Sequence, residues 1–442
     1  MSGDRADTGT VRLVISASLI ALALLAWPTS PSLSAAETAF SNKQVEHLLK
    51  RKLEKKGLEP KRISGCHAKR GHIWLCDWTA TGAKLAVPFE CEGSARFNAQ
   101  TRGWKGTRCG DPMVPLLAQP GPHPIWGYND EFEQLSLQAL DLAAAGGSET
   151  VRVFLRWGRI EGEPDQYGWE PYDRLLGEMY SRGIRPLLVL SHTPCWATQK
   201  CEPLPPPPEY FEAIASVRPP GPDALDDAGE VAALAAQRYP YALGIEVWNE
   251  PNLKKFWYPA PDPELYSALV GEVARAVHAA NPEMPVIAAG LAPQKEDDAG
   301  GIGYENFLRR AYAAGGLQLA DAIGAHPYPL RPYKADYLGS IRAQLYRYLR
   351  VMAEFGDADK PIWVTEVGVA EGDGYTLDQQ ADALVKIYAL FRRIANTPVL
   401  LYHRLIDYVS SVYPEARYGV VSQSGELKPA YCAMAAAREH PC

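Results

Sequence analysis

The sequence lacks several features that would place it in a common class. It has no internal repeat and no glycine-rich turn of the kind that binds phosphate after a strand. No two of its eight cysteines show the CxxC spacing of a zinc site. What is present is ordinary for a folded soluble protein, with 47% hydrophobic and 22% charged residues, which excludes a fibrous or largely disordered chain.

The first residues have the order of an export signal. Arg5 and Arg12 precede an apolar run at 13–27, and small residues follow at 34–36. The run is shorter than the roughly 20 residues that span a bilayer, so we expect residues 1–36 to be a signal peptide cleaved before Glu37. A retained N-terminal anchor is the alternative. Both interpretations predict an exported protein, either secreted or held in the periplasm or cell envelope.

The cysteines support this prediction, because an even number in an exported chain favours disulfides. Their spacing indicates local pairs rather than metal ligands. Two pairs close short segments, and two more flank expected turns and would bridge neighbouring strands. The four expected disulfides are Cys195–Cys201, Cys432–Cys442, Cys66–Cys76 and Cys91–Cys109.

Residues 37–112 are expected to form a small α+β module stapled by disulfides, with a helix at 43–56 and strands near 73–79 and 85–90. Residues 37–111 hold fifteen Lys and Arg against eight Asp and Glu, whereas the whole chain has a net charge of −7. A basic module on an acidic chain favours docking to an anionic envelope or matrix polymer. A solvated basic face without a partner explains the same composition.

Residues 113–442 alternate short apolar runs with amphipathic helical segments, which is typical of parallel α/β folds. Eight strand-helix units predict a (β/α)8 TIM barrel rather than a doubly wound sheet. A long proline-rich connection after the third strand, including 205–208, is expected to shape a site. The expected strands are 125–128, 151–155, 186–191, 243–248, 285–289, 322–326, 362–365 and 399–403, and the expected helices include 131–144, 171–182, 263–280, 340–354, 377–396 and 429–438.

Two glutamates stand where expected strands end, which is the functional face of such a barrel. Glu250 lies in the segment WNEPN that ends the fourth strand, and Glu366 lies in VTEVG at the end of the seventh. A lone strand-end glutamate is usually a solvated loop residue. Two of them from opposite sides of one ring indicate glycoside cleavage, which needs one protonated and one ionised carboxyl group.

These motifs resemble the retaining glycoside hydrolases of clan A, with catalytic glutamates on strands four and seven. The segment WNEPNLKKFWYP at 248–259 is similar to family 39 and to related bacterial endoglycosidases that act on exopolysaccharides, and the resemblance covers 125–434. It implies that Glu250 is the acid/base and Glu366 the nucleophile. The stretch IGAHPYP at 323–329 belongs to the same pattern.

The resemblance also implies roles for polar neighbours. Asn249 would hydrogen-bond the sugar 2-hydroxyl, and Arg152 would keep the nucleophile ionised. His326 and Tyr328 would lie beside the nucleophile, where a phenol donates a hydrogen bond without titrating near neutrality. For Arg152, a salt bridge in the barrel lining is the alternative.

Aromatic residues near the strand ends are candidates for stacking on sugar rings. We expect Trp196 and Trp257 to do so, with packing as the alternative, whereas Trp157 is expected to be structural. At the eighth strand the clan's usual tryptophan is replaced, by our alignment, with Tyr402. His403 and Arg404 follow it, and an inward-pointing Arg404 would suit an acidic or phosphate-bearing sugar.

The sequence therefore predicts a retaining glycoside hydrolase acting on a polysaccharide or oligosaccharide, with no cofactor and no nucleic-acid partner. A non-catalytic carbohydrate-binding envelope protein on the same barrel is the alternative. That class usually loses one of the two glutamates, and this chain keeps both. A metal-dependent hydrolase barrel is disfavoured because the nine histidines are scattered and no HxH follows the first strand.

Overall fold

The structure is a computed structural model that describes residues 40–56, 58–70, 73–84, 87–105, 123–129, 136–201, 218–329, 337–372, 375–394, 396–408 and 417–442. The expected signal segment, both expected domain boundaries and the proline run at 205–208 lie outside these residues. The chain forms two units, Met1–Ser41 and Asn42–Cys442, and only the last two residues of the first are described. Among the described helices, none has both the length and the apolar character needed to cross a membrane.

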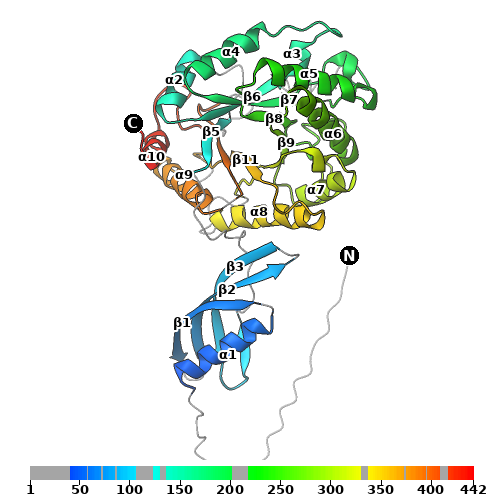
Figure 1. The fold of residues 1–442 in the computed structure, drawn as a ribbon. Helices are drawn as coiled ribbons and strands as arrows, with labels where there is room; N and C mark the ends of the chain where they lie inside the picture. The colour runs from blue at the N-terminus through cyan, green and yellow to red at the C-terminus, as the bar shows by residue number, and fades with distance from the viewer. Residues whose placement is uncertain are drawn as a thin grey trace, which may run out of the picture. The chain divides into compact units, whose positions relative to one another are not determined.

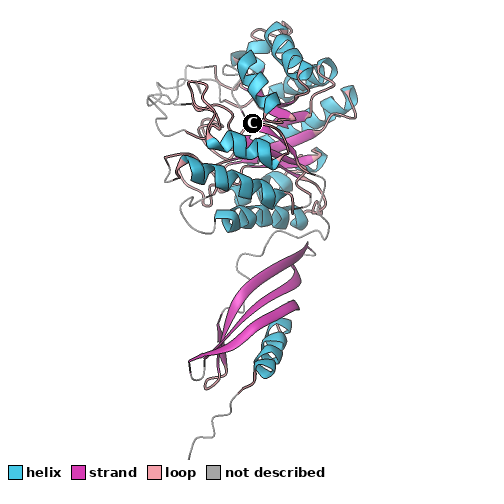
Figure 2. Ribbon diagram, turned by 90° about the vertical axis from the view of Figure 1, so that its left-hand side faces the viewer, coloured by secondary structure: helices cyan, strands magenta, loops and turns pink. Residues whose placement is uncertain are grey.

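The N-terminal part of the second unit is the predicted α+β module. Helix α1 (Asn42–Glu54) buries Val45, Leu49 and Leu53, which recur every four residues along one face. It is followed by a four-stranded antiparallel sheet in the order β1-β2-β3-β4. Figure 2 shows the helix beside this sheet. The strands are β1 (Glu59–Arg70), β2 (Ile73–Lys84), β3 (Val87–Asn98) and β4 (Gly103–Lys105).

The sheet is larger than the sequence predicts. Strand β1 was not expected, because its sequence EPKRISGCHAKR carries four Lys and Arg and no apolar alternation. It exists because it pairs with β2 along its length, and the Cys66–Cys76 disulfide joins the two strands. Strands β2 and β3 also extend beyond the expected runs for the same reason, since pairing to a neighbour overrides weak local preference.

The rest of the second unit is a closed parallel barrel of eight strands, with the last strand paired to the first (Figure 1). The TIM-barrel prediction is confirmed, and each predicted strand overlaps one barrel strand. Their bounds are β5 (Ile125–Asn129), β6 (Thr150–Arg156), β7 (Arg185–Ser191), β8 (Gly244–Val247), β9 (Val286–Leu291), β10 (Ala322–Ala325), β11 (Ile362–Val367) and β12 (Val399–His403).

Helices surround the strands (Figure 1). Two begin at clear sequence signals: Asp262 caps α6 by accepting from the Leu265 N–H at 2.9 Å, and Thr376 caps α9 in a reciprocal capping box with Gln379. The helices are α2 (Leu137–Ala145), α3 (Trp157–Ile160), α4 (Glu170–Ser181), α5 (Leu225–Arg238), α6 (Pro263–Ala280), α7 (Tyr304–Ala313), α8 (Tyr337–Glu354), α9 (Leu377–Phe391) and α10 (Pro429–Ala437).

The barrel interior changes character along its axis. Inward-facing apolar residues, among them Leu187, Ile287, Trp363 and Leu401, form a plug that is separate from the larger core between strands and helices. Strand alternation then brings polar residues inward two positions later, Thr365 after Trp363 and His403 after Leu401. A polar layer therefore lies above the plug, toward the C-terminal ends of the strands.

Three disulfides are described: Cys66–Cys76, Cys195–Cys201 and Cys432–Cys442. They are pairs that the spacing predicts. The second closes a loop after β7, and the third ties α10 to the C-terminal residue. The expected Cys91–Cys109 pair lies outside the described residues.

Candidate active site

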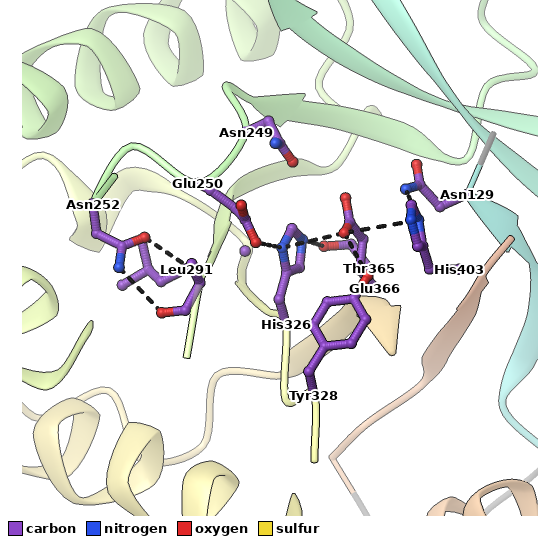
Figure 3. Close-up of polar contacts among 12 residues, drawn as sticks. Asn129, Asn249, Glu250, Asn252, Leu291, His326, Tyr328, Thr365, Glu366 and His403 are labelled. Carbon is purple, nitrogen blue, oxygen red and sulfur yellow. Dashed lines mark hydrogen bonds and ion pairs between the residues drawn. The ribbon is translucent and has the colours of Figure 1, made fainter. Parts of the chain in front are cut away.

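The two predicted glutamates meet at the C-terminal end of the barrel. Glu250 follows β8 and Glu366 lies near the end of β11, and each is 7% exposed. Three atoms lie within 4.8 Å of one another: one carboxylate oxygen of Glu250, one of Glu366 and a ring nitrogen of His326. Figure 3 shows the two carboxyl groups on either side of the His326 imidazole.

Arg152 on β6 organises the polar layer beneath them. Its buried guanidinium donates from Nε to Glu246 Oε2 at 2.5 Å and from Nη1 to Glu366 Oε1 at 2.8 Å. Nη1 also donates to Asn129 Oδ1 at 3.1 Å, and Nη2 donates to Asn249 Oδ1 at 2.8 Å. Burial alone would lower the pKa of Arg152, but the negative charges of Glu246 and Glu366 raise it. The residue is both a lining salt bridge and a partner of the expected nucleophile.

Glu366 is held in its ionised form. Burial alone would raise the pKa of its carboxyl group, but the electrostatic interactions with His326 and with the Arg152 guanidinium outweigh burial and lower the pKa to about 2. The Tyr328 hydroxyl donates to Glu366 Oε2 at 2.8 Å, as the sequence led us to expect. Burial, and then the charge of Glu366, raises the pKa of Tyr328 well above its ordinary value, so this phenol remains a donor.

Glu250 has a different environment. Its Oε1 lies 3.0 Å from His326 Nδ1, and its Oε2 lies 4.0 Å from Lys255 Nζ. His326 was expected beside the nucleophile, but its Nδ1 lies 3.7 Å from Glu366 Oε2 and is therefore closer to Glu250. The reason is that His326, just after β10, sits between the ends of β8 and β11 and can face both carboxylates.

The WNEPN segment places Glu250 by backbone contacts. Glu250 has a left-handed backbone, with φ of 42°, and its N–H donates to the Gly290 carbonyl at 3.2 Å. Asn252 donates to the carbonyls of Ala292 and Ile302 at 3.1 Å and accepts from the Ala292 N–H. These contacts tie the end of β8 to the end of β9. A backbone conformation that is costly for a non-glycine residue is thus fixed by its neighbours.

The side-chain amide of Asn249 is oriented by its contact with Arg152. Because its Oδ1 accepts from Arg152, its Nδ2 carries two protons that it can donate away from the guanidinium. The side chain is nearly buried and lies beside the two glutamates (Figure 3). The amide is therefore positioned as a hydrogen-bond donor at the site.

Two residues of the site were not predicted from the sequence. Asn129 ends β5, and its Nδ2 donates to His403 Nδ1 at 2.9 Å because its Oδ1 already accepts from Arg152. His403 ends β12, with Nδ1 4.0 Å from Glu366 Oε2. Burial lowers the pKa of His403 to about 4 despite the opposing charge of Glu366. The ring is therefore neutral at ordinary pH, with its proton on Nε2.

Glu246 and Thr365 were also missed. Glu246 has no solvent exposure, and its carboxylate accepts from Arg152, from the Gly290 N–H at 2.9 Å and from the Thr365 hydroxyl at 2.9 Å. A charged residue in the apolar strand GIEV is a signal that could have found it, since a buried charge needs a partner and Arg152 stands on another strand.

Four residues expected to contact the sugar have buried or packing positions in the structure instead. Tyr402 faces outward, packs beside Trp126 and donates to the Val369 carbonyl at 3.1 Å, so His403 rather than Tyr402 faces the site. Trp257 is 1% exposed and lies between Trp248 and Tyr266, because the chain after Glu250 turns back into the core.

Arg404 is buried and its guanidinium stacks on the Tyr408 ring, so it presents little surface to an acidic sugar. Trp196 is half-buried. It packs edge-on against Trp157, its ring N–H donates to the Glu161 carbonyl at 3.2 Å, and these are the contacts of a packing residue. Trp157 is buried, in agreement with its expected structural role.

The cluster of Glu250, His326 and Glu366 also has a spacing that a small cation could use. The Arg152 guanidinium already neutralises Glu366, and a second positive charge beside it is electrostatically disfavoured. Hydrogen bonds to His326 and Tyr328 occupy the same oxygens. The donor set is better explained as a proton-handling site than as a metal centre.

No protein-family model matches the chain. Solved structures with the same fold include a family 39 glycoside hydrolase from Bacteroides cellulosilyticus WH2, with a TM-score of 0.53 and 18% identity over 85% of this chain and 79% of that one. The chain shares the TIM-barrel fold of this glycoside hydrolase. At this identity the similarity concerns the fold.

Two further proteins are similar to this chain, one in structure and one in a short stretch of sequence. The GH5_18 enzyme of Streptomyces cattleya, solved in complex with GlcNAc, has a TM-score of 0.53 and 18% identity over 72% of this chain and 80% of that one. A 6-phospho-beta-glucosidase of Dickeya chrysanthemi is 35% identical over 82 residues. That match spans 17% of this chain and only 18% of the curated relative.

Proposed function

We propose that this protein is a retaining glycoside hydrolase that cleaves O-glycosidic bonds in a polysaccharide or oligosaccharide. The observation that carries the proposal is the pair of nearly buried carboxyl groups, Glu250 and Glu366, which lie close together but have different hydrogen-bond partners. One is held ionised by Arg152 and Tyr328, whereas the other faces an imidazole nitrogen. Two carboxyl groups held in different protonation states are what glycoside cleavage requires.

In the first step, Glu366 attacks the anomeric carbon while the bond to the leaving oxygen breaks, and Glu250 transfers its proton to that oxygen. In the second step, a water molecule attacks the anomeric carbon of the glycosyl-enzyme. Glu250 takes the proton of that water, and the Glu366 carboxylate leaves. The Asn249 amide would donate to a sugar hydroxyl during both steps.

Glu246 is the competing partner for Glu366, because it too is a buried glutamate close to Arg152. Its lack of exposure and its three donors leave no lone pair directed to a substrate. Glu250 has partial exposure and a face toward Glu366. Accessibility therefore favours Glu250 as the acid/base and gives Glu246 the role of holding Arg152.

The spacing of the pair supports retention. Carboxyl groups lie about 5 to 5.5 Å apart in retaining enzymes and about 6.5 to 9.5 Å apart in inverting ones, which need room for a water. One oxygen of Glu250 lies within 4.8 Å of one oxygen of Glu366, which is compatible with the shorter, retaining separation. Direct attack by Glu366 fits this distance.

We further propose that the protein is exported. The three described disulfides support an oxidising compartment, in which such bonds persist. The substrate would then be a glycan outside the cytoplasm. The complex of the Streptomyces cattleya enzyme with GlcNAc supports a sugar ligand for this protein as well.

The test is product analysis of the purified protein on a panel of microbial and plant polysaccharides, with the anomeric configuration of the new reducing end followed by NMR. Retention of configuration is the expected result. Inversion contradicts the assigned mechanism. Binding of a glycan without any cleavage supports instead the carbohydrate-binding protein that the sequence leaves as an alternative.

Three variants separate the roles. Glu366→Gln should abolish turnover on every substrate, whereas Glu250→Gln should keep turnover of activated aryl glycosides, whose leaving group needs no proton. Glu246→Gln is the matched control, since it removes a buried carboxylate without removing either proposed group. If Glu246→Gln, rather than Glu250→Gln, shows the dependence on leaving group, the acid/base assignment is wrong.

A further inference from the structure

Four side chains from three strand ends form a hydrogen-bonded chain that leads to Glu250. Thr365 Oγ1 lies 2.9 Å from Glu246 Oε1, His326 Nε2 lies 3.1 Å from Thr365 Oγ1, and His326 Nδ1 lies 3.0 Å from Glu250 Oε1. We propose that Thr365 is a positioning residue that fixes the tautomer of His326 and thereby keeps the catalytic proton on Glu250. This inference rests on the proposed function of Glu250.

The donor and acceptor roles in these hydrogen bonds follow from Glu246, the buried end of the series. Glu246 is paired with Arg152 and also accepts from the Gly290 N–H, so its ionised carboxylate can only accept. The Thr365 hydroxyl must therefore donate its single proton to Glu246. Toward His326 the same hydroxyl has only lone pairs to offer, so His326 Nε2 must carry a proton.

The other ring nitrogen then decides where the catalytic proton lies. A neutral imidazole with a proton on Nε2 presents a lone pair on Nδ1. Facing Glu250 Oε1 at 3.0 Å, that lone pair makes a hydrogen bond only when a proton lies between the two atoms. The resting pair thus holds one proton, the proton that cleavage must deliver. After delivery the Glu250 carboxylate faces a lone pair, which favours recovery of a proton from the attacking water.

Close packing against Gly290 holds the His326 ring in this position. A Cβ on Gly290 would lie 2.1 Å from His326 Cδ2 and 2.9 Å from Thr365 Oγ1, so β9 is shaped around the imidazole and the hydroxyl. The Gly290 N–H and carbonyl meanwhile bind Glu246 and the Glu250 N–H. Gly290 therefore binds Glu246 and Glu250 through its backbone, and its missing side chain leaves room for His326 and Thr365.

Other charged and titratable groups also act on the Glu250–His326 pair. They surround it from the loop after β8, from β6, from the residues after β10, from α8 and from the ends of β11 and β12. All of them remain when only the Thr365 hydroxyl is removed, so a change at this position isolates its effect. They are Lys255, Arg152, Tyr328, Tyr348, Glu366 and His403.

The test compares Thr365→Val, which keeps the shape but loses the hydroxyl, with Thr365→Ser, which keeps the hydroxyl. With Thr365→Val, the His326 proton is free to move to Nδ1 and to donate to an ionised Glu250. We expect the alkaline limb of kcat/KM on a poor leaving group to move to lower pH by about one unit, with about tenfold less activity at neutral pH. Activated aryl glycosides should be affected little, and Thr365→Ser should restore the wild-type profile.

A second measurement reads the tautomer directly. In 15N-labelled wild-type protein, side-chain NMR of His326 should show the proton on Nε2, and Thr365→Val should lose this preference. A proton on Nδ1 in the wild type, or an unchanged pH profile in Thr365→Val, overturns the proposed role of Thr365 even if the protein is an active glycosidase. If the wild type cleaves no glycan, the proposed function fails, and the NMR result still decides whether Thr365 fixes the tautomer of His326.

Discussion

Arg152 Nη1 donates to Glu366 Oε1 at 2.8 Å, and this contact joins the proposed nucleophile to the buried polar layer of the barrel. The same guanidinium bonds Glu246, Asn129 and Asn249, so one planar cation fixes four side chains from the ends of three strands, β5, β8 and β11. A lysine cannot reproduce this fork geometry. Arg152 therefore links stability to catalysis, and changes at this residue should affect both.

We expect Arg152→Met to lower the free energy of unfolding by about 3 to 5 kcal/mol, because it leaves the carboxylates of Glu246 and Glu366 buried without a cation. Turnover should be lost as well. Urea unfolding and kcat measure the two effects. Arg174→Met, which removes an exposed pair with Glu170, should change stability by less than about 1 kcal/mol.

Adding Glu246→Gln to Arg152→Met should restore part of the lost stability without restoring turnover, because one uncompensated charge is removed while Glu366 remains unpaired. Independent, additive effects of the two changes would contradict direct coupling between them.

Glu366 should make stability depend on pH in the acid range. Its pKa in the folded protein, about 2, is below its ordinary value of 4.5, so its ionised form stabilises the fold above about pH 4.5. That contribution, on the order of 3 kcal/mol, is lost as pH falls from about 4.5 through about 2. Urea unfolding between pH 7 and pH 3 should show a smaller loss for Glu366→Gln than for the wild type. The control is Glu178→Gln, which removes a partly exposed partner of Arg182 and should leave the wild-type pH dependence.

The neighbours Tyr402 and His403 should separate stability from catalysis. We expect His403→Phe to lower kcat/KM about 10- to 100-fold, because it removes the acceptor of Asn129 and a polar group 4.0 Å from Glu366. Tyr402→Phe should leave kcat/KM unchanged and lower stability by about 1 kcal/mol, since its hydroxyl bonds the Val369 backbone. The opposite pattern would mean that Tyr402, not His403, faces the sugar.

This pair also shows what could be predicted from the sequence. The barrel was predictable because each strand is a short apolar run between helical patterns, and both glutamates stand at strand ends. Tyr402 was assigned by aligning residues beyond the strand. Strand alternation favours His403, because Val399 and Leu401 belong to the inward-facing cluster and Tyr402 to the outer core.

Other features needed the fold itself. Strand β1 depends on pairing with β2, which no local pattern in its charged sequence indicates. Thr365 and Gly290 matter because separate strands bring them against His326. Trp257 was misassigned because a tryptophan after a catalytic motif has the same sequence signature whether it stacks on a sugar or fills a core.

The basic N-terminal module leads to a last prediction, that it holds the enzyme near an anionic polymer. The side chains of Lys50 and Arg51 on α1 and of Lys55 just after it are exposed, while the opposite face of the helix is buried. Changing these three residues to Glu should weaken retention on an anionic polysaccharide, and the remaining retention should depend less on salt, because surface charge attraction is screened at high ionic strength.

Turnover of small soluble glycosides should be unchanged, since none of the residues assigned to the site lies in this module. The matched control reverses three exposed charges of the barrel, Arg174 on α4, Lys386 on α9 and Arg393 just after α9, which should leave retention nearly as in the wild type. The measurement is column retention at about 50 mM salt, where charges attract over a longer distance, and at about 500 mM salt, where this attraction is largely screened. Equal loss in both triple variants would mean that net charge alone governs retention. No loss in the α1 variant would mean that its basic face is simply solvated.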